Sequence, residues 1–140
     1  MKNKTYLHPT QEAGKAFFSK KSEGSVVMLN LLKFNEFADY SKSPELAPDN
    51  KISGKAAYQL YIQHTLPFLK AAGSEVIYQG KSDSFLIGPE DEKWDVVLLV
   101  KHKSAAKFME FATNEGYLAG AGHRTAALAD SRLLPIEKGF

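Results

Sequence analysis

The order of elements along the chain predicts an α+β fold of the split βαβ kind, in which an antiparallel sheet carries both helices on one face. Three observations predict it. Residues 26–34 and 94–103 are rich in valine and leucine and indicate strands. Residues 53–71 place apolar side chains at helical spacing between those strands. A second helical segment and a last strand, at 130–138, complete the order.

Residues 9–20 predict a short helix ahead of this plan, so that residues 1–25 form an N-terminal helical extension. Pro9 suits the first helical position, and an apolar stripe follows it, made of Ala13, Ala16 and Phe17. The strand at 26–34 comes next as a nearly continuous apolar run, which favours a strand that is covered on both faces.

Residues 35–52 predict a long loop insertion. The segment contains Pro44 and Pro48, several polar residues and no clear period. Structureless segments of this length inside a domain tend to be lids or disordered insertions. We expect this loop to be the most mobile internal segment, because it has few groups to bury.

The helix at 53–71 has clear boundary signals. Ser53 can cap its start, Pro67 should bend it, and Gly73 is a left-handed terminator. We expect its apolar stripe to face the sheet, and the stripe consists of Tyr58, Tyr61, Ile62, Thr65 and Leu69.

The next segment leaves two alternatives open. Residues 76–88 form either a hairpin or one long bulged strand, with Gly80 near the break. The strand at 94–103 is clearer, because alternate residues from Trp94 to His102 share one face.

The last helical stretch starts at a cap, Ser104, and Asn114 can restart it toward residue 128. Three glycines weaken that second part. The final strand contains Pro135, which argues for a position at the edge of the sheet.

The apolar strands also predict self-association. Valine and leucine point to both sides of the sheet, and the two helices cover one side only. A second copy of the same sheet is the economical cover for the other side, which would otherwise be a large exposed apolar patch. We therefore expect a homodimer in the form of a dimeric α/β barrel.

The composition fits one domain over residues 1–140. The net charge is +2 with both signs interspersed, and nucleic-acid binders more often show a concentrated basic face. No window has the apolar length of a membrane span, and the first residues do not form a secretory signal. Cysteine is absent, as fits a reducing compartment. We expect a cytoplasmic protein that binds neither nucleic acid nor membranes.

Several short motifs occur in a consistent order: Asn30-Leu31-Leu32-Lys33-Phe34, Tyr58 and Tyr61 with Pro67-Phe68-Leu69, Ala72-Gly73, Gly80, Trp94-Asp95, and Tyr117 followed by Arg124. In these motifs the chain resembles the dimeric α/β-barrel proteins of ferredoxin-like fold, and most of all a domain-of-unknown-function family related to the antibiotic-biosynthesis-type monooxygenases. The resemblance implies a pocket between the sheet and the helices of each subunit. It implies no particular reaction, because that family has no common substrate. The Ala72-Gly73 turn departs from the paired glycines expected there.

Motifs for metals, nucleotides and activated nucleophiles are missing. The four histidines stand at no helical metal-binding spacing, and there is no thiol. Neither Gly-x-Ser-x-Gly nor a phosphate-binding glycine loop occurs. We predict neither a cofactor nor a metal, and a site that depends on an apolar cavity with a few hydrogen-bonding groups.

Asn30 is the most informative polar residue, because asparagine is a poor strand former that must satisfy its amide when buried. Either it lines a pocket and points its amide at a ligand, or a neighbouring backbone group or water satisfies it. We expect the pocket, because a sheet has few spare backbone partners, with Tyr58, Tyr61 and Trp94 as its walls.

The other candidate ligand-binding residues also have two interpretations. Tyr58 and Tyr61 are either ligand contacts or core tyrosines with hydroxyls at a rim. His64 contacts a ligand or packs helices together, and Trp94 walls the pocket or plugs the barrel end. Tyr117, His123 and Arg124 belong to the last helical stretch. Arg124 pairs with a carboxylate at the dimer seam or anchors a ligand carboxylate.

Heme chemistry is a further alternative within this fold. The heme-degrading branch uses an asparagine on the first strand, a tryptophan in the last helix and a histidine further along. Asn30 and His123 resemble two of these residues, but Phe111 stands near the tryptophan's place and the spacing to His123 is about two residues too long.

The resulting hypothesis is a small-molecule-binding dimeric barrel protein, with activity as a cofactor-free monooxygenase on an aromatic or polyketide-like compound. The alternatives are a non-catalytic ligand-binding or stress-related dimer and, third, a heme-binding or heme-degrading protein. A pocket that contains Asn30, Tyr58 and a histidine close together would favour an enzyme, whereas a site filled by its own side chains would favour a structural role.

Overall fold

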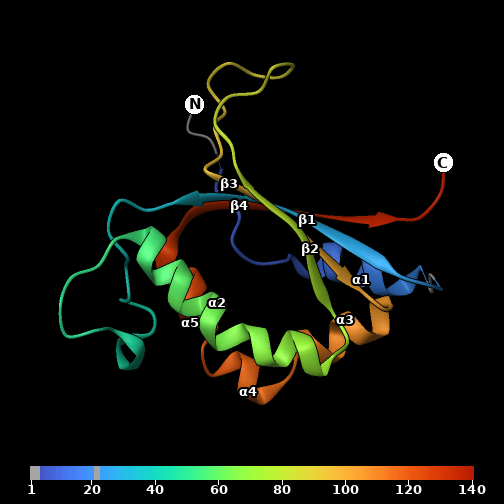
Figure 1. Cartoon of the computed structure of the whole chain (residues 1–140), viewed down its shortest axis with the longest axis horizontal. Helices are drawn as coiled ribbons and strands as arrows, with labels where there is room; N and C mark the ends of the chain where they lie inside the picture. The colour runs from blue at the N-terminus through green and yellow to red at the C-terminus, as the bar shows by residue number, and fades with distance from the viewer. Residues whose placement is uncertain (1–3, 21–22) are drawn as a thin grey trace.

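A computed structural model describes residues 4–20 and 23–140, and it shows a four-stranded antiparallel sheet with its helices on one side (Figure 1). The predicted extension over residues 1–25 includes positions 1–3 and 21–22, which lie outside the described residues. The elements in order are α1 (Gln11–Ser19), β1 (Val26–Phe34), the 3₁₀ helix η1 (Pro44–Leu46), α2 (Gly54–Ala71), β2 (Glu75–Lys81), β3 (Val96–His102), α3 (Ala105–Ala112), α4 (Glu115–Leu118), α5 (Gly122–Ala127) and β4 (Leu128–Glu137).

The strand order is β2-β3-β1-β4, and β1 is antiparallel to both of its neighbours. This is the ferredoxin-like split βαβ plan that the element order predicts. β4 lies at an edge, as its Pro135 requires, and the other edge is β2.

The boundaries of α2 agree with the prediction. The Ser53 side chain accepts a hydrogen bond from the Ala56 amide at 3.0 Å, and Gly73 takes the left-handed conformation with a φ of 73° after the last turn. Four stripe residues are buried on the sheet side, namely Tyr58, Tyr61, Thr65 and Leu69. Tyr58 and Tyr61 pack with Leu32 of β1 in one core cluster.

Three local predictions differ from the structure. Thr10, not Pro9, is the boundary residue of α1, because its side chain accepts from the Ala13 amide at 3.0 Å. Residues 85–87 are neither half of a hairpin nor part of a long strand, because β2 ends at Lys81 after a bulge and the chain leaves the sheet. The last helical stretch starts at the predicted cap Ser104 and restarts at the predicted cap Asn114, but a second, unpredicted break separates α4 from α5, which runs directly into β4.

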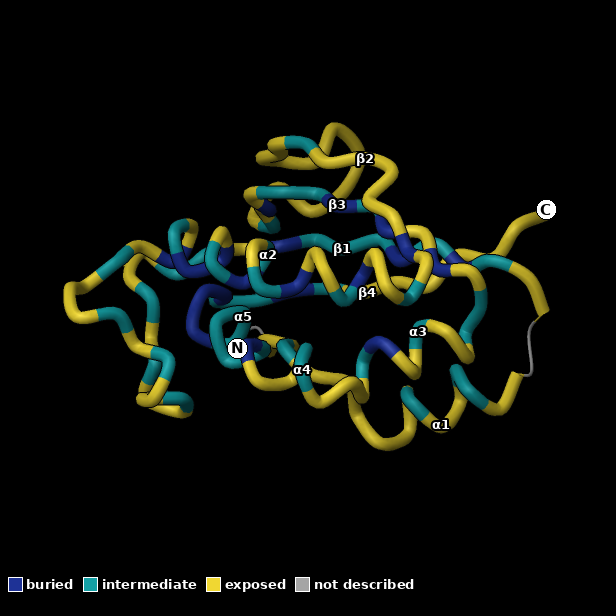
Figure 2. Tube along the Cα trace, turned by 60° about the horizontal axis from the view of Figure 1, so that its bottom comes forward, coloured by how far each residue is buried: buried dark blue, intermediate teal, exposed yellow. Residues whose placement is uncertain are grey.

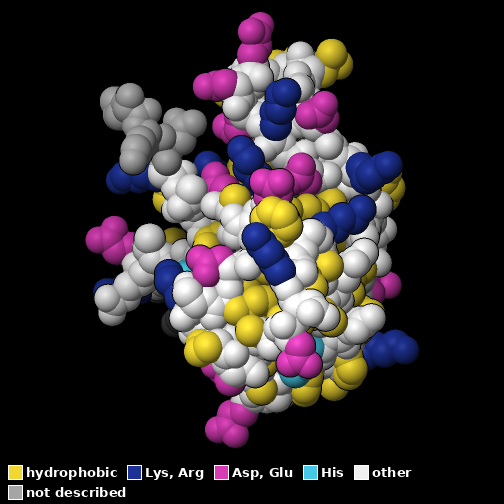
Figure 3. Space-filling model, turned by 90° about the vertical axis from the view of Figure 1, so that its left-hand side faces the viewer, with side chains coloured by type: hydrophobic (Ala, Val, Ile, Leu, Met, Phe, Trp, Pro, Cys, Tyr) yellow, Lys and Arg dark blue, Asp and Glu magenta, His cyan; other side chains and the backbone are white. Residues whose placement is uncertain are grey.

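The segment 82–95, called the arm below, projects from the end of the β2–β3 pair away from the helices (Figure 1). Residues 82–91 are all exposed (Figure 2), and the arm carries Leu86 fully exposed beside the exposed Ile87. Figure 3 shows the projection at the top of the view, with hydrophobic and acidic side chains together. Apolar residues at such a tip have the sequence pattern of a strand, but none of the described residues covers Leu86 or Ile87.

The loop 35–52 is tied to the domain at its base. The Asp39 amide donates to the Ala126 carbonyl at 2.9 Å, and the Ala38 amide donates to Ile52 at 2.9 Å. The backbone amide of Asn35 donates to the Ala127 carbonyl at 2.8 Å, and its side-chain amide donates to the Ala126 carbonyl at 3.1 Å. The segment between β1 and α2 is irregular apart from η1, and its mobility stays a prediction.

The register shows which residues face away from the helices. Leu32 packs on α2, so Leu29 and Leu31 point to the opposite side of β1. Directly paired residues share a face. The apolar residues of the open face are therefore Val27, Leu29 and Leu31 of β1, Val97 and Leu99 of β3, Tyr78 of β2, and Leu134 and Ile136 of β4.

Candidate functional site

Three tyrosines meet between α2 and α4. The hydroxyl groups of Tyr61 and Tyr117 lie 2.8 Å apart, and the ring centroids of Tyr58 and Tyr61 are 5.2 Å apart. Burial raises the pKa of Tyr58 to about 12 and raises that of Tyr61 well above its ordinary value. Both groups are therefore neutral hydrogen-bonding phenols at neutral pH.

Arg124 of α5 places its charge beside these phenols, where it opposes the rise in the pKa of Tyr58 and Tyr61. The guanidinium is half-buried, and it donates to the Leu7 carbonyl at 2.7 Å and to Ser131 Oγ at 3.3 Å. Both acceptors are neutral. In the part of the chain that the structure describes, no carboxylate forms an ion pair with Arg124. The predicted carboxylate partner is therefore not supplied by this chain's described residues.

A second positive charge, that of Lys42, lies near Arg124 on the outer side of the tyrosine cluster, because both charges act on His8. Burial lowers the pKa of His8, and the charges of Arg124 and Lys42 lower it further. Lys42 comes from the loop 35–52, and it lies near Asp39, whose pKa it helps to lower. Lys42 therefore has a carboxylate near it, whereas the interactions shown for the described residues give none to Arg124.

Asn30 lies on the helix side of β1, as predicted, but its surroundings differ from the prediction. Its amide nitrogen is 3.2 Å from the Met28 carbonyl and 3.3 Å from the Leu98 carbonyl. A sheet has few spare backbone partners, but Asn30 finds two of them, because carbonyl oxygens have two lone pairs and accept a second hydrogen bond. Backbone groups therefore satisfy the amide nitrogen without a ligand.

His64 joins two helices. Its Nε2 lies 2.7 Å from the Gly116 carbonyl and 3.2 Å from that of Tyr117, and since carbonyls only accept, Nε2 carries the proton. This contact holds α4 against α2, which is the helix-packing interpretation.

His123 belongs to a different group. Its Nδ1 lies 2.7 Å from the hydroxyl of Tyr40 in the loop 35–52. Burial and the neighbouring His64 lower the pKa of His123, and burial raises that of Tyr40. Both groups are thereby favoured in the neutral form, and their hydrogen bond fastens the loop to α5.

Trp94 is nearly fully buried two residues before β3, and its Nε1 donates to Glu92 at 2.9 Å. The guanidinium of Arg132 lies over its ring at 5.0 Å and over the Tyr6 ring at 4.8 Å. The Ser82 hydroxyl donates to the Trp94 carbonyl at 2.6 Å, so the polar partners shown for Trp94 come from residues 82–92 and from Arg132, and none is a tyrosine of the α2 cluster.

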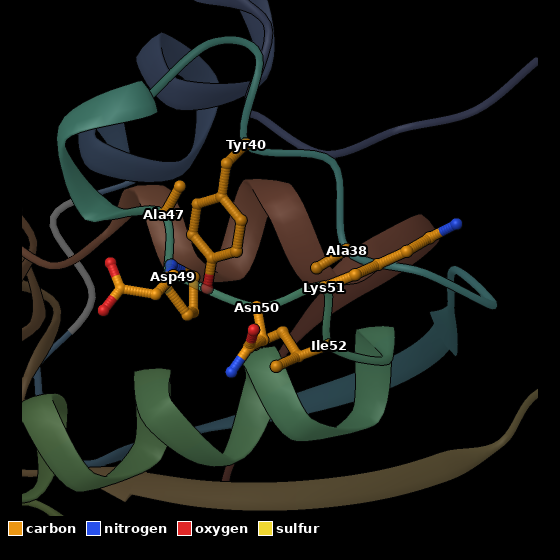
Figure 4. A pocket seen from close by; sticks show the side chains of 8 residues that line it. Ala38, Tyr40, Ala47, Asp49, Asn50, Lys51 and Ile52 are labelled. Carbon is orange, nitrogen blue, oxygen red and sulfur yellow. The ribbon is translucent and has the colours of Figure 1, made fainter.

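A hollow of about 190 Å³ lies in the loop 35–52, not between the sheet and the helices (Figure 4). Tyr40, Pro48 and Ile52 line it together with polar residues of the loop. It is smaller than the roughly 300–1,000 Å³ of typical ligand pockets. Between the sheet and α2, by contrast, the predicted walls Tyr58 and Tyr61 are packed into the core.

The residues named for heme do not fit a heme site. Asn30 bonds to its own sheet, His123 bonds to Tyr40, and Phe111 packs with Leu69 and Leu98 in the second core cluster. Among the described residues, no hydrogen bond or ring contact joins these three positions to one another. Groups of three or more histidine or acidic side chains placed to hold a metal ion are likewise absent from the residues described.

Sequence reasoning missed two members of the site, Leu7 and Ser131. Leu7 packs on the Tyr58–Tyr61 cluster, and the Ser131 hydroxyl, which is buried, donates to the Tyr6 carbonyl. Their contacts with Arg124 span 117 and 7 residues, and no local pattern marks either residue. The position of Thr65 on the stripe was predicted. That its buried hydroxyl has no hydrogen-bond partner in the structure was not predicted.

The described helices include none that is long and apolar enough to cross a membrane. No protein-family model matches the chain. No curated protein matches it either.

Solved structures do match. The methylated RPA0582 protein is 32% identical, with a TM-score of 0.86 over 97% of this chain and 96% of that chain. The RPA0582 protein of unknown function from Rhodopseudomonas palustris is 31% identical, with a TM-score of 0.85 over 98% and 99%. A dimeric protein of unknown function with a ferredoxin-like fold from Bacteroides fragilis shares 10% identity, a TM-score of 0.50, and coverage of 81% and 96%.

The last likeness shows the fold alone. The first two extend over nearly the whole of both chains at more than 30% identity. The chain therefore belongs to the same protein family as RPA0582 of Rhodopseudomonas palustris.

Proposed function

We propose that the protein is a homodimer that binds a small molecule where Arg124 meets Tyr58, Tyr61 and Tyr117. The observation that carries the binding site is the charge of Arg124. It is half-buried, it is held by neutral acceptors, and it lies beside two buried phenols. Partial burial of a charge is costly unless an opposite charge or strong hydrogen bonds offset it, and an anionic ligand would supply both.

The open face supports the dimer. Leu134, Ile136 and Tyr78 are 58%, 41% and 65% exposed there, and they adjoin the leucines of β1 and β3. Such a patch is typical of an interface between subunits. The arm projects on the side away from the helices, where a second copy would lie, and the Bacteroides fragilis protein of this fold is dimeric.

A pair of leucine substitutions tests the dimer. Leu134→Lys puts a charge on the open face, whereas Leu66→Lys changes a leucine of similar exposure, 44%, on α2. Light scattering on a sizing column should show a dimer for the natural chain and for Leu66→Lys, and a monomer or a weakened dimer for Leu134→Lys. A natural chain that is monomeric at micromolar concentration contradicts the proposal.

Binding without catalysis is the form of this function that the geometry supports best. Tyr58 and Tyr61 are held protonated, so neither is a base near neutral pH. His64 uses its Nε2 proton to hold α4, and His123 is engaged by Tyr40. The interior is also packed by its own side chains, which favours a non-catalytic role.

Cofactor-free oxygenation is the second candidate, and one observation favours it. The guanidinium of Arg124 and the nearby phenols would stabilise an enolate or phenolate of an aromatic substrate. Anthrone would then be converted by one O₂ to anthraquinone with release of one water. Oxygen uptake with anthrone should exceed the uncatalysed rate and fall in Arg124→Gln, and uptake equal to the uncatalysed rate would remove this candidate.

A further inference from the structure

The N-terminal segment crosses the edge of the sheet at the proposed site. This segment, residues 4–10, is called the strap. The Tyr6 amide donates to Asp130 Oδ1 at 2.8 Å on the open side of β4, where Asp130 pairs with Lys33. The next residue, Ser131, faces the helices and donates its hydroxyl to the Tyr6 carbonyl. The strap therefore passes from one face of the sheet to the other at Tyr6 and Leu7.

Leu7 meets the site with two different groups. Its side chain packs, partly buried, against the core cluster that contains Tyr58 and Tyr61. Its carbonyl oxygen accepts the hydrogen bond from Arg124 Nη1 at 2.7 Å. One residue thus presents a compact apolar body to the phenols and an oxygen acceptor to the guanidinium.

A carboxylate would complement Arg124 better than this carbonyl does. A carboxylate carries a full negative charge and two oxygens that match the two donor nitrogens of a guanidinium, and charge-assisted bonds are about twice as strong as neutral ones. Arg124 already directs Nη1 and Nη2 at two separate neutral oxygens. A single guanidinium matches a single negative charge, and Lys42 has Asp39 beside it.

We propose that Leu7 occupies the place of the ligand, and that the ligand is an apolar monocarboxylic acid which displaces the strap. Its carboxylate would bind Arg124, and its body would lie against Tyr58 and Tyr61 where the Leu7 side chain now packs. This inference rests on the proposed function and adds to it the ligand class and a built-in competitor.

The strap is attached in a way that permits displacement. Its described contacts with β4 are the two Tyr6 hydrogen bonds and the stacking of Arg132 on the Tyr6 ring. The helix that follows is held separately, because Phe17 and Phe18 of α1 pack on Phe108 of α3 at 6.1 and 6.5 Å. The strap can therefore leave the site while α1 stays in place.

Benzoate tests the ligand class on the natural full-length dimer. In calorimetric titrations we expect benzoate to bind on the order of tenfold more tightly than its neutral isostere benzamide, because only the acid offers a charge to Arg124. Arg124→Gln should lose this preference and Arg124→Lys should keep part of it. Lys103→Gln, which removes the same charge beside Gly73 after the C-terminal end of α2, should bind benzoate as the natural chain does.

Three results would overturn the ligand class: equal binding of benzoate and benzamide, unchanged benzoate binding in Arg124→Gln with a native circular dichroism spectrum, or equally tight binding of inorganic phosphate. The comparison of benzoate with benzamide uses the natural chain, so it decides the matter even where an Arg124 variant does not fold.

The competition between Leu7 and the ligand needs its own readout. Leu7→Ala shrinks the apolar body but keeps the carbonyl, and it should tighten benzoate binding by roughly threefold to tenfold, since the competitor is weakened. Saturating benzoate should also speed hydrogen exchange at the Tyr6 amide, which Asp130 now protects. Weaker binding by Leu7→Ala, or unchanged exchange at Tyr6, would show that the strap is a fixed wall.

The two levels of the proposal fail in different ways. A native dimer whose bound small molecule is neutral, and whose binding weakens in Arg124→Gln, refutes the carboxylate and leaves the proposed function. A protein that binds no small molecule refutes both.

Discussion

Ser74 Oγ and His102 Nδ1 lie 2.7 Å apart inside the core, where they join the start of β2 to the end of β3. Both residues are buried, and the ring of His102 meets the ring of Phe108 edge-on at 4.9 Å. Burial lowers the pKa of His102 to about 4, so the ring is neutral at neutral pH.

This pair predicts a loss of stability in mild acid. The unfolded chain binds a proton at His102 near pH 6.5, whereas the folded chain resists it until about pH 4. The free energy of unfolding therefore has its full value above pH 6.5, where His102 is neutral in both states. It falls by about 2–3 kcal/mol as the pH falls to about 4, because the unfolded chain binds the proton first. Urea unfolding of the natural chain and of His102→Gln should show a shallower decline in the variant over this range. Parallel declines would contradict it.

The hydrogen bond between Tyr61 and Tyr117 predicts a measurable coupling. Tyr61→Phe and Tyr117→Phe should each lower the free energy of unfolding by about 1 kcal/mol, because each leaves one hydroxyl without its partner. The double variant should cost less than the sum, with a coupling of about 0.5–1.5 kcal/mol in a double-mutant cycle. Additive costs would mean that the two hydroxyls do not interact in solution.

Gly54 predicts a strong intolerance to a side chain. A Cβ there would lie 2.6 Å from the Ala127 carbonyl oxygen and closer still to that of Asn35, and both are backbone atoms. Gly54→Ala should lower the free energy of unfolding by about 1–3 kcal/mol or more, because the loop 35–52 and α5 would both have to move away from the start of α2. Gly14→Ala is the matched control, since nothing lies within 4 Å and the position is helical, so it should gain about 0.5–1 kcal/mol. Thermal unfolding compares the two, and equal effects would contradict the packing described.

Much of the fold could be predicted from local signals. β1 has the predicted bounds, and α2 lies between its predicted cap Ser53 and terminator Gly73, because apolar period and capping chemistry act over a few residues. The edge position of β4 likewise follows from Pro135 alone. Residues 85–87 were not predictable in this way, because an apolar triplet looks the same whether it pairs in a sheet or projects from it.

The candidate site depended on contacts that no local pattern contains. Tyr58, Tyr61, Tyr117 and Arg124 were foreseen as candidates, and the structure brings them together. Asn30 was overvalued, because satisfaction of its amide by Met28 and Leu98 depends on sheet geometry. Leu7 was missed, because an apolar residue in an N-terminal segment shows no sign of the arginine that it will meet.

Native mass spectrometry of the purified protein, sprayed without denaturation, tests the central claim most directly because it weighs the assembly and its bound molecules together. The account predicts a main species at twice the chain mass of 15.5 kDa, with additional mass from a bound small molecule that is released on activation. A species at 15.5 kDa without additional mass, at micromolar concentration, would contradict it.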